Sequence, residues 1–386
     1  MEIKHLLKNH AYQNIPLNFD EAYGLGVYAL DGCHGDTLAQ VQSIAVLSAL
    51  HNRATYAWQW SKEAEAAHGH SVPRNSAEQI AGICAAVFEL DIARSEAGFL
   101  QPAVPYAMDN CGMGGDLVVT ANVSTIAALI AAAGGIPMCK HGSPANADNG
   151  HHGSSDFVSL LGIQTFASKR AVEHSLECCG FGYTEALDVR YKRIHLQTHE
   201  IAKLPHMNDI IGPMTNPLSP EIHTRRVLGL NHLISPALAA QAYRELNRRG
   251  YTRLERGLFI RGYVDGSGYQ GVDEVSICPG GTLVAELRDD RINEYRLEAQ
   301  DFGLAPVPVS SISPPKGLSK GEFSLAILKG EIAGPPLQMV LANAALLFYL
   351  ADRSTDWREC YAMAESVFMS GKAYKTALKA RDVLTK

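Results

Sequence analysis

Apolar positions recur every three or four residues in the first quarter of the chain, which is the period of an amphipathic helix. The segment TLAQVQSIAVLSALHNRA (37–54) has this spacing. SAEQIAGICAAVFEL (76–90) opens with Ser76 as a helix cap and Glu78 in the first turn. The pattern therefore predicts a small all-helical N-terminal domain over residues 1–95.

The pattern changes near residue 104, where short apolar runs bounded by glycine turns begin to alternate with helical segments. The runs IPMCKHG (136–142) and GLFIRGY (257–263) are candidate strands. STIAALIAAAGG (124–135) and ALAAQAYRELNRRG (237–250) have helical patterns. Strands that alternate with helices predict an α/β domain with a central parallel or mixed sheet flanked by helices.

Composition narrows the class of protein. The chain has 386 residues, a formal net charge of −6 and a pI near 6.2, so it has no overall basic field for a polyanion, and nucleic acid is an unlikely partner. It shows no signal peptide and no apolar run of membrane-spanning length, so we expect a soluble cytoplasmic protein. The eight cysteines are scattered and are expected to be reduced. Cys178 and Cys179 raise the alternative of redox chemistry, but neighbouring cysteines are awkward to bridge.

The stretch CGMGGD (111–116) is a candidate binding loop. Gly112, Gly114 and Gly115 permit positive φ and carry no Cβ, so backbone N–H groups can close around an anion. Asp116 follows at once, and a carboxylate repels a neighbouring phosphate unless a divalent cation lies between them. The loop therefore indicates a magnesium-bound phosphate or diphosphate; the alternative is an ordinary glycine turn.

A predicted helix N-terminus follows this loop. Asn122, Ser124 and Thr125 lie where free N–H groups and the helix dipole favour an anion. Lys140, just after the helix, supplies a point charge suited to phosphate. These residues predict a phosphate-rich ligand; the alternative is that Ser124 only caps the helix.

Two later segments add to this picture. CKHGSPANADNGHHGSSD (139–156) is glycine-rich and typical of an active-site lid, and the role of its His151 and His152 stays open between solvent, substrate and zinc. In GVDEVS (271–276), Asp273 and Glu274 follow a candidate strand, and in a turn both can reach metal ions. The alternative is an exposed, solvated acidic turn.

Taken in order, these segments resemble the anthranilate phosphoribosyltransferase family, whose pattern runs GTGGD, TFNIST, AAAG, KHGN, GSAD, LGP with NP, and DE with S. The chain has GMGGD (112–116), TANVST (120–125), AAAG (131–134), KHGS (140–143), GSSD (153–156), IGPMTNP (211–217) and VDEVS (272–276). The agreement runs from about residue 104 to the C-terminal SGKA.

The resemblance implies a transferase that moves the phosphoribosyl group of phosphoribosyl pyrophosphate (PRPP) to an aromatic amine or nitrogen acceptor, anthranilate or a relative of it, with release of diphosphate. It implies Mg²⁺ as cofactor and a homodimer formed through the helical domain. It also implies that helices near 168–204 complete the helical domain, and that residues 104–167 and 205–386 form the α/β domain.

Site residues are carried over position by position. Those implied to bind PRPP are Gly112, Gly114, Gly115, Thr120, Asn122, Ser124, Thr125 and Lys140. Those implied to serve magnesium are Asp116, Ser124, Asp273 and Glu274. Those implied to meet the acceptor are His141, Ser143, His199 and Gly212.

The acceptor side departs from the family pattern. The family has Asn and then Arg after KHG, where this chain has Ser143 and Pro144. The family also has an Arg ahead of LGP that binds the anthranilate carboxylate, and His199 stands near that position here. We therefore expect the donor site to be kept and the acceptor site to be altered.

Two other classes of protein are less consistent with the residues. GSGYQG (266–271) matches the dinucleotide fingerprint, but it leads into a turn and a strand and not into the helix that a pyrophosphate needs. A non-catalytic relative that binds nucleotide or nucleic acid is the alternative function. Decayed donor motifs and a basic charge would favour it, and the chain has neither.

Overall fold

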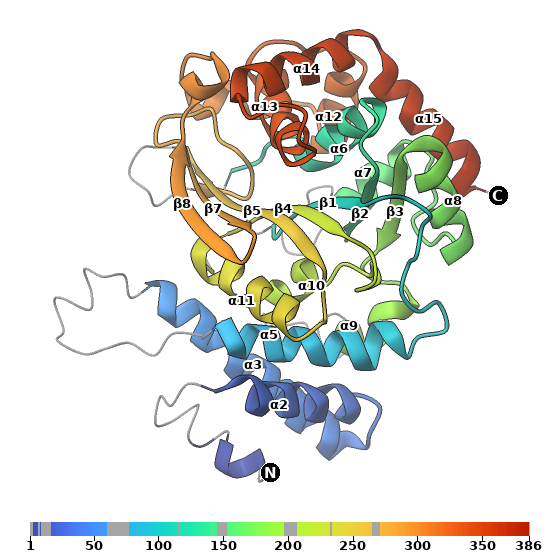
Figure 1. The fold of residues 1–386 in the computed structure, drawn as a ribbon, viewed down its shortest axis with the longest axis vertical. Helices are drawn as coiled ribbons and strands as arrows, with labels where there is room; N and C mark the ends of the chain where they lie inside the picture. The colour runs from blue at the N-terminus through green and yellow to red at the C-terminus, as the bar shows by residue number, and fades with distance from the viewer. Residues whose placement is uncertain are drawn as a thin grey trace, which may run out of the picture. The chain divides into compact units, whose positions relative to one another are not determined.

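The computed structural model describes residues 3–6, 8, 17–59, 77–114, 116, 118–144, 153–196, 207–231, 234–264 and 271–385. The fold is α/β, with a central mixed sheet flanked by helices and a helical N-terminal region, as the sequence predicts (Figure 1). The chain divides into a helical unit (Met1–Phe99, Ala186–Pro217 and His232–Thr252) and a sheet unit (Leu100–Glu185, Leu218–Asn231 and Arg253–Lys386). None of the described helices has both the length and the apolar character needed to cross a membrane.

The helical unit is built on α2, which begins with a capping box. Asn18 Oδ1 accepts the Glu21 N–H at 2.9 Å, and Glu21 Oε2 accepts the Asn18 N–H at 3.0 Å. At Gly82 of α5 the two helices cross closely, because a Cβ there would lie 2.5 Å from the Phe19 carbonyl oxygen. Ser76, the predicted cap of α5, lies outside the described residues. The helices of this unit are α2 (Phe19–Gly32), α3 (Thr37–Gln59), α5 (Ala77–Val87), α9 (Lys192–His195), α10 (Asn208–Met214) and α11 (Pro236–Arg248).

The boundaries of the helical unit differ from the expected return at 168–204. Helix α8 (Lys169–Cys179) belongs to the sheet unit, because its apolar face packs on β3 (Phe181–Glu185). Helix α11 joins the helical unit, where it packs against α5 and its Tyr243 hydroxyl donates to the Met214 carbonyl oxygen at 2.5 Å. The resemblance implied other bounds, and a helical period shows that a helix has an apolar face but not which partner covers it.

The sheet runs in the order β3-β2-β1-β4-β5-β7-β8, with β6 paired to β5. The five strands from β3 to β5 are parallel, and β6, β7 and β8 are antiparallel to their neighbours. The sheet is therefore mixed, and the carboxyl ends of its parallel strands share one edge. The strands not yet placed are β1 (Ala107–Gly112), β2 (Met138–Gly142), β4 (Thr224–Gly229), β5 (Leu254–Tyr263), β6 (Gly271–Val272), β7 (Thr282–Arg288) and β8 (Arg291–Leu297).

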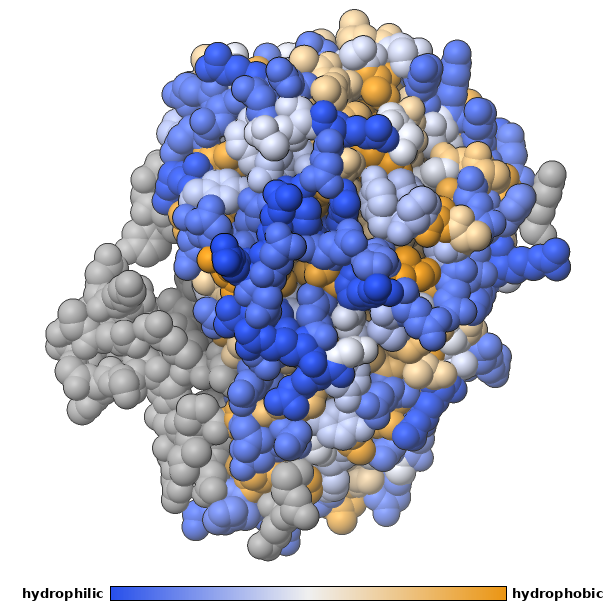
Figure 2. All heavy atoms as spheres, viewed as in Figure 1, coloured by the Kyte–Doolittle hydropathy of each residue, from blue (hydrophilic) through white to orange (hydrophobic). Residues whose placement is uncertain are grey.

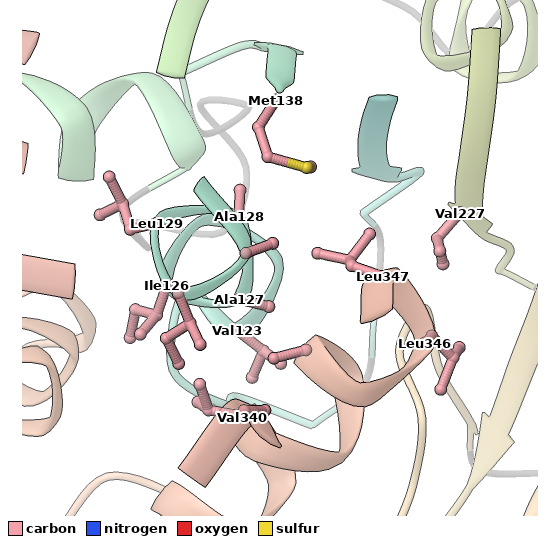
Figure 3. Close-up of a cluster of buried hydrophobic side chains, with 14 of the residues drawn as sticks. Val123, Ile126, Ala127, Ala128, Leu129, Met138, Val227, Val340, Leu346 and Leu347 are labelled. Carbon is pink, nitrogen blue, oxygen red and sulfur yellow. The ribbon is translucent and has the colours of Figure 1, made fainter. Parts of the chain in front are cut away.

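Helices from the middle and the end of the chain cover one face of this sheet (Figure 1). Figure 3 shows Met138 of β2 and Val227 of β4 directed toward this helical layer. Hydrophilic residues predominate on the face of the molecule seen in Figure 2, which agrees with burial of the apolar side chains. The helices of the sheet unit besides α8 are α6 (Val123–Ala133), α7 (Ser154–Leu160), α12 (Lys320–Leu328), α13 (Pro335–Leu350), α14 (Trp357–Met369) and α15 (Lys372–Leu384).

Asn343 of α13 holds the segment after β6 in place. Its side-chain oxygen accepts the Val275 N–H at 2.8 Å, and its amide donates to the Val275 carbonyl oxygen at 3.1 Å. Both residues are buried, so neither backbone group has water as a substitute. This pair of bonds fixes the residues next to Asp273 and Glu274.

We therefore expect Asn343→Leu to lower the free energy of unfolding by about 2–4 kcal/mol, because two buried backbone groups lose their partners. Urea denaturation followed by circular dichroism measures the change. Asn293→Leu, at an exposed position of β8, is the matched control and should change the stability by less than about 0.5 kcal/mol. Equal effects of the two substitutions would contradict the role given to Asn343.

Candidate functional site

The acidic turn after β6 lies against the carboxyl ends of three strands, and each strand has a glycine there. A Cβ at Gly112 of β1 would lie 2.0 Å from Asp273 Oδ2, and one at Gly229 of β4 would lie 1.5 Å from the Asp273 carbonyl oxygen. A Cβ at Gly262 of β5 would lie 2.4 Å from the Glu274 carbonyl oxygen. These contacts leave no room for a side chain, so the three glycines make space for the acids.

The loop after β1 wraps the same carboxylate. Gly114 has φ +71°, a conformation that favours glycine, and its N–H donates to Asp273 Oδ2 at 2.6 Å. Its carbonyl oxygen accepts Asn231 Nδ2 at 2.9 Å. The glycine loop predicted from the sequence is therefore present and lies at the acids. Gly115 lies outside the described residues.

Three carboxylates, those of Asp116, Asp273 and Glu274, meet at this point. They offer ligand oxygens that all lie within 4.8 Å of one another. The Asp273 N–H donates to both Asp116 oxygens, at 3.1 and 3.2 Å. Asp273 is 8% exposed and Glu274 7%, so the expectation of an exposed, solvated turn is wrong: close packing against the strand-end glycines covers it.

Burial and mutual repulsion both act on these groups. Burial raises the pKa of Glu274 to about 8, with the negative charge of Asp273 acting in the same direction and a smaller effect of Lys320 opposing both. Burial, followed by the charges of Asp273 and Glu274, raises the pKa of Asp116 well above its usual range. Three carboxylates can lie this close only if bound protons or a cation offset their negative charges. Clustered carboxylate oxygens are the ligands that Mg²⁺ prefers, so the donor set fits the magnesium predicted from the sequence.

The N-terminus of α6 and Lys140 form the second part of the site. Asn122 is the residue before α6, as predicted, and Ser124 and Thr125 lie in its first turn. The buried Lys140 Nζ donates to the Asn110 carbonyl oxygen at 2.7 Å and to Ser124 Oγ at 3.3 Å. Both acceptors are neutral. A buried ammonium group beside a helix N-terminus creates a positive potential that favours an anion.

Polar atoms around this helix end are only partly satisfied. Asn122 is held by Ser324 of α12, whose Oγ accepts the Asn122 N–H at 2.8 Å and donates to its side-chain oxygen at 3.0 Å. Thr125 Oγ1 and Asn110 Oδ1 are buried and have no hydrogen-bond partner among the described residues. Thr120 Oγ1 donates to Glu274 Oε2 at 3.3 Å, which links this segment to the acids. The structure thus brings together the predicted donor residues that it describes.

His141 lies apart from Lys140, although the two are consecutive. Neighbouring residues of a strand point to opposite faces of the sheet, and Lys140 points toward α6. His141 Nδ1 lies 3.3 Å from Asp109 Oδ2, and Arg226 Nη2 lies 3.2 Å from the same oxygen. All three side chains are buried. Asp109 and Arg226 are register partners on β1 and β4, so the sheet itself places this pair.

The other predicted acceptor residues belong to different units of the chain or lie outside the described residues. Ser143 accepts the Ser155 N–H through its carbonyl oxygen at 3.2 Å, and Gly212 lies in α10 of the helical unit. His199 lies outside the described residues, as do His151 and His152. The acceptor assignment therefore stays a prediction, as does Ser124 as a magnesium ligand.

Sequence reasoning missed the residues that support the site from a distance. They are Asp109, Arg226, Asn231, Ser324 and Asn343. A signal was available for the first two, because a charged residue inside an apolar strand such as MDNC (108–111) or RRVLGL (225–230) needs a buried partner. The last two lie on helices whose contacts with the site depend on the tertiary fold.

A family model described as glycosyl transferase family, a/b domain, matches residues 104–374. The chain is 29% identical to an anthranilate phosphoribosyltransferase of Haloarcula marismortui over 344 residues, which are 88% of this chain and 94% of that protein. It is 30% identical to an anthranilate phosphoribosyltransferase of Symbiobacterium thermophilum over 293 residues, 75% of this chain and 80% of that protein.

Solved structures agree with these relatives. The crystal structure of anthranilate phosphoribosyltransferase from Thermus thermophilus superposes with a TM-score of 0.72, at 26% identity and over 99% of both chains. The Saccharomyces cerevisiae enzyme in complex with PRPP and Mg has a TM-score of 0.73 over 99% of this chain and 98% of that one, and at 21% identity it shows a shared fold.

The buried Asp109–Arg226 pair predicts a pH-dependent stability. Burial alone would raise the pKa of Asp109, but Arg226 and then His141 outweigh it and lower the pKa from 3.8 to about 2. The pair therefore stabilises the fold above about pH 4, and the stabilisation is lost as the pH falls toward 2. We expect Arg226→Met to cost about 3–5 kcal/mol at pH 7, because it leaves the buried Asp109 carboxylate without its permanently charged partner and with His141 alone.

Urea denaturation of wild type and Arg226→Met between pH 7 and pH 3 measures this effect. The difference in unfolding free energy should shrink as the pH falls, because Asp109 takes up a proton at a higher pH in the variant than in the wild type, where Arg226 keeps its pKa low. A difference that stays constant over this range would show that Arg226 contributes through packing alone.

Proposed function

Since this chain belongs to the anthranilate phosphoribosyltransferase family of glycosyltransferases, we propose that it transfers the phosphoribosyl group of PRPP to an aromatic amine, anthranilate or a relative of it, with release of diphosphate. It is an enzyme of the pentosyltransferase class. The observation that carries the proposal is the convergence of three carboxylates, those of Asp116, Asp273 and Glu274, on the glycine loop that follows β1. A phosphate-rich donor and a divalent cation together explain why a fold would keep both features at one place.

The residues proposed to bind PRPP, the phosphoribosyl donor, have different roles. The N-terminus of α6 binds phosphate oxygens through N–H groups, and the glycine loop at Gly112 and Gly114 positions Asp273, which accepts the Gly114 N–H. Lys140 adds the positive charge, and Thr125 Oγ1 offers a donor that has no other described partner. Asn122 and Thr120 keep the segment between the loop and the helix in position through Ser324 and Glu274.

Asp116, Asp273 and Glu274 would hold Mg²⁺, with Ser124 as a further ligand. When bound, Mg²⁺ neutralises the charge that develops on the departing diphosphate. The bond from ribose C1 to the diphosphate oxygen breaks and a bond from C1 to the acceptor nitrogen forms, through an oxocarbenium-like state. The chain contributes electrostatic stabilisation through its aligned donors, which suits a reaction with a good leaving group.

The residues at the predicted acceptor positions differ from those with which the family binds anthranilate. They therefore favour a different acceptor. Ser143 and Pro144 stand where the family has Asn and Arg, and His199 stands near the expected carboxylate-binding Arg. His141 remains, held by Asp109, which in turn pairs with Arg226. We infer that the acceptor is an aromatic amine whose anionic group is different or absent.

The metal ligands generate one prediction. Asp273→Asn/Glu274→Gln should lower kcat/KM for PRPP by about 1,000-fold or more, because the variant loses the ligands of the cation. The fold should survive, because the change removes buried like charges. A diphosphate-release assay with PRPP and Mg²⁺ measures turnover, and circular dichroism reports the fold. Asp289→Asn/Asp290→Asn, an exposed acidic pair in the β7–β8 turn, is the matched control and should keep full activity. Near-normal turnover in the first variant would remove the metal assignment.

The acceptor residues generate another prediction. Anthranilate should be a weak substrate, because a neutral imidazole cannot replace the two-pronged, permanently charged contact of an arginine, a loss of roughly 2–5 kcal/mol. Any activity with anthranilate should rise as the pH falls through about 6.5, where His199 gains a proton. Steady-state kinetics at saturating PRPP and Mg²⁺ test this. A low-micromolar KM for anthranilate that His199→Ala leaves unchanged would contradict it and would indicate ordinary tryptophan biosynthesis.

We also propose that the enzyme is a homodimer formed through the helical unit and that it acts in the cytoplasm. Leu38 and Val41 of α3 are 64% and 56% exposed and lie within one turn of each other, which supports a subunit contact. All eight cysteines are free thiols, which supports a reducing compartment.

Leu38→Glu/Val41→Glu should therefore convert the dimer to a monomer, because two charges would have to be buried at the contact. Light scattering coupled to size-exclusion chromatography measures the mass. Met369→Glu, an equally exposed apolar position on α14, is the control and should leave the mass unchanged. A monomeric wild type, or a dimer that survives the double substitution, would contradict the proposed subunit contact through α3.

A further inference from the structure

Helix α8 ends in two adjacent cysteines that lie away from the donor site. The helix stops at Gly180, which has φ +73° and donates its N–H to the Leu176 carbonyl oxygen at 2.9 Å. Ser175 Oγ donates to the Phe181 carbonyl oxygen at 2.7 Å, which ties the last turn to β3. Cys178 and Cys179 thus sit on a helix end whose backbone is fixed. They adjoin the amino end of β3, whereas Lys140 lies at the middle of β2, its parallel neighbour, where it pairs with Tyr183.

The two thiols differ from every other cysteine of the chain. The other six, Cys33, Cys84, Cys111, Cys139, Cys278 and Cys360, are buried. Cys178 is exposed and Cys179 is partly exposed, and their sulfur atoms lie 3.3 Å apart. The chain therefore presents one pair of neighbouring thiols to solvent and shields the rest.

The distance between the sulfurs favours a shared ligand over a disulfide. A disulfide bond is about 2.05 Å long and joins residues whose Cα atoms are usually at least about 4.4 Å apart. Adjacent residues have Cα atoms about 3.8 Å apart, so a disulfide here would need the fixed end of α8 to distort. Consider one arsenic or metal atom bonded to two sulfur atoms, each bond about 2.3 Å long. The two sulfurs then lie about 3.3 Å apart if the S–atom–S angle is near 90°, and about 3.8 Å apart if the angle is tetrahedral. The observed spacing matches that range.

We propose that Cys178 and Cys179 form a dithiol site for a thiophilic centre, a trivalent arsenical or a soft metal ion, that accepts both sulfurs at once. The two sulfurs are the ligands that this site offers. The site is independent of the donor site and does not rest on the proposed function.

The chemistry with an arsenical balances without any oxidant. Phenylarsine oxide condenses with two thiols: two S–H bonds and the As–O bond break, two S–As bonds form, and one water molecule leaves. No electrons are transferred, and the arsenical oxygen takes both protons. Burial, followed by the hydrogen bond to Cys178, raises the pKa of Cys179 to about 11, which keeps this thiol protonated and slow toward oxidants but does not prevent the condensation.

The test uses the full-length native protein and phenylarsine oxide as the probe. A thiol reagent such as 5,5′-dithiobis(2-nitrobenzoate) should titrate no more than two thiols per chain, and one equivalent of phenylarsine oxide should protect them. A dithiol competitor should release the arsenical, whereas a monothiol at the same concentration should not. Cys178→Ser and Cys179→Ser should each weaken binding by at least 100-fold, because a single thiol cannot chelate.

The double variant Cys178→Ser/Cys179→Ser is the matched control, since it keeps the six buried cysteines and should bind no arsenical. Circular dichroism of each variant confirms that the fold is kept. Wild-type protein that does not bind phenylarsine oxide, single variants that bind it as wild type does, or a double variant that still binds it would each overturn the proposal. Phosphoribosyl transfer should continue with the arsenical bound, which separates this site from the donor site.

Discussion

Repulsion among three close carboxylates, two of them buried and the third, Asp116, partly buried, is the constraint around which the sheet unit is organised. Asp116, Asp273 and Glu274 offer oxygens within 4.8 Å of one another, in a place that water does not reach freely. Such an arrangement is unfavourable unless something compensates the charge. The surrounding structure keeps the acids there all the same: glycines at the ends of three strands clear the space, and Asn343 fixes the adjoining backbone. A cation that also meets a phosphate ligand accounts for this arrangement.

The alternation of side chains along β2 separates two electrostatic environments. Lys140 points toward α6 and creates, with the helix N-terminus, a positive region beside the acids. His141, the next residue, belongs to a buried cluster with Asp109 and Arg226 on the other face of the sheet. One strand thus places a cation for the donor on one face and a histidine with a fixed carboxylate partner on the other. This division fits a chain whose donor motifs match the family and whose acceptor motifs do not.

The sequence predicted what local patterns and short motifs determine. The glycine loop, the acids after β6, Asn122 at the start of α6 and Lys140 all follow from residue type and spacing, and the alternation of strand and helix indicated the fold class. Contacts between distant segments were out of reach. Ser324 meets Asn122 across 202 positions of sequence, and the pairing of Asp109 with Arg226 depends on strand register.

Burial and helix placement also escaped prediction, for physical reasons. The sequence predicted Asp273 and Glu274 as metal ligands and left a solvated turn as the alternative; that the turn is enclosed follows from the glycines of neighbouring strands. Helix α8 belongs to the sheet unit and α11 to the helical unit, which differs from the bounds that the resemblance implied; an amphipathic pattern cannot decide this, because it is the same whether a sheet or another helix covers the apolar face.

The central claim is that the acidic cluster and the glycine loop bind PRPP together with a divalent cation. Calorimetric titration of PRPP into the wild-type protein, with Mg²⁺ and again with excess chelator, tests this claim directly, alongside the same titrations of Asp273→Asn. The account predicts that the wild type binds PRPP only with Mg²⁺ and that the substitution weakens this binding by about 100-fold or more. Equal PRPP affinity with and without Mg²⁺, or in wild type and variant, would contradict it.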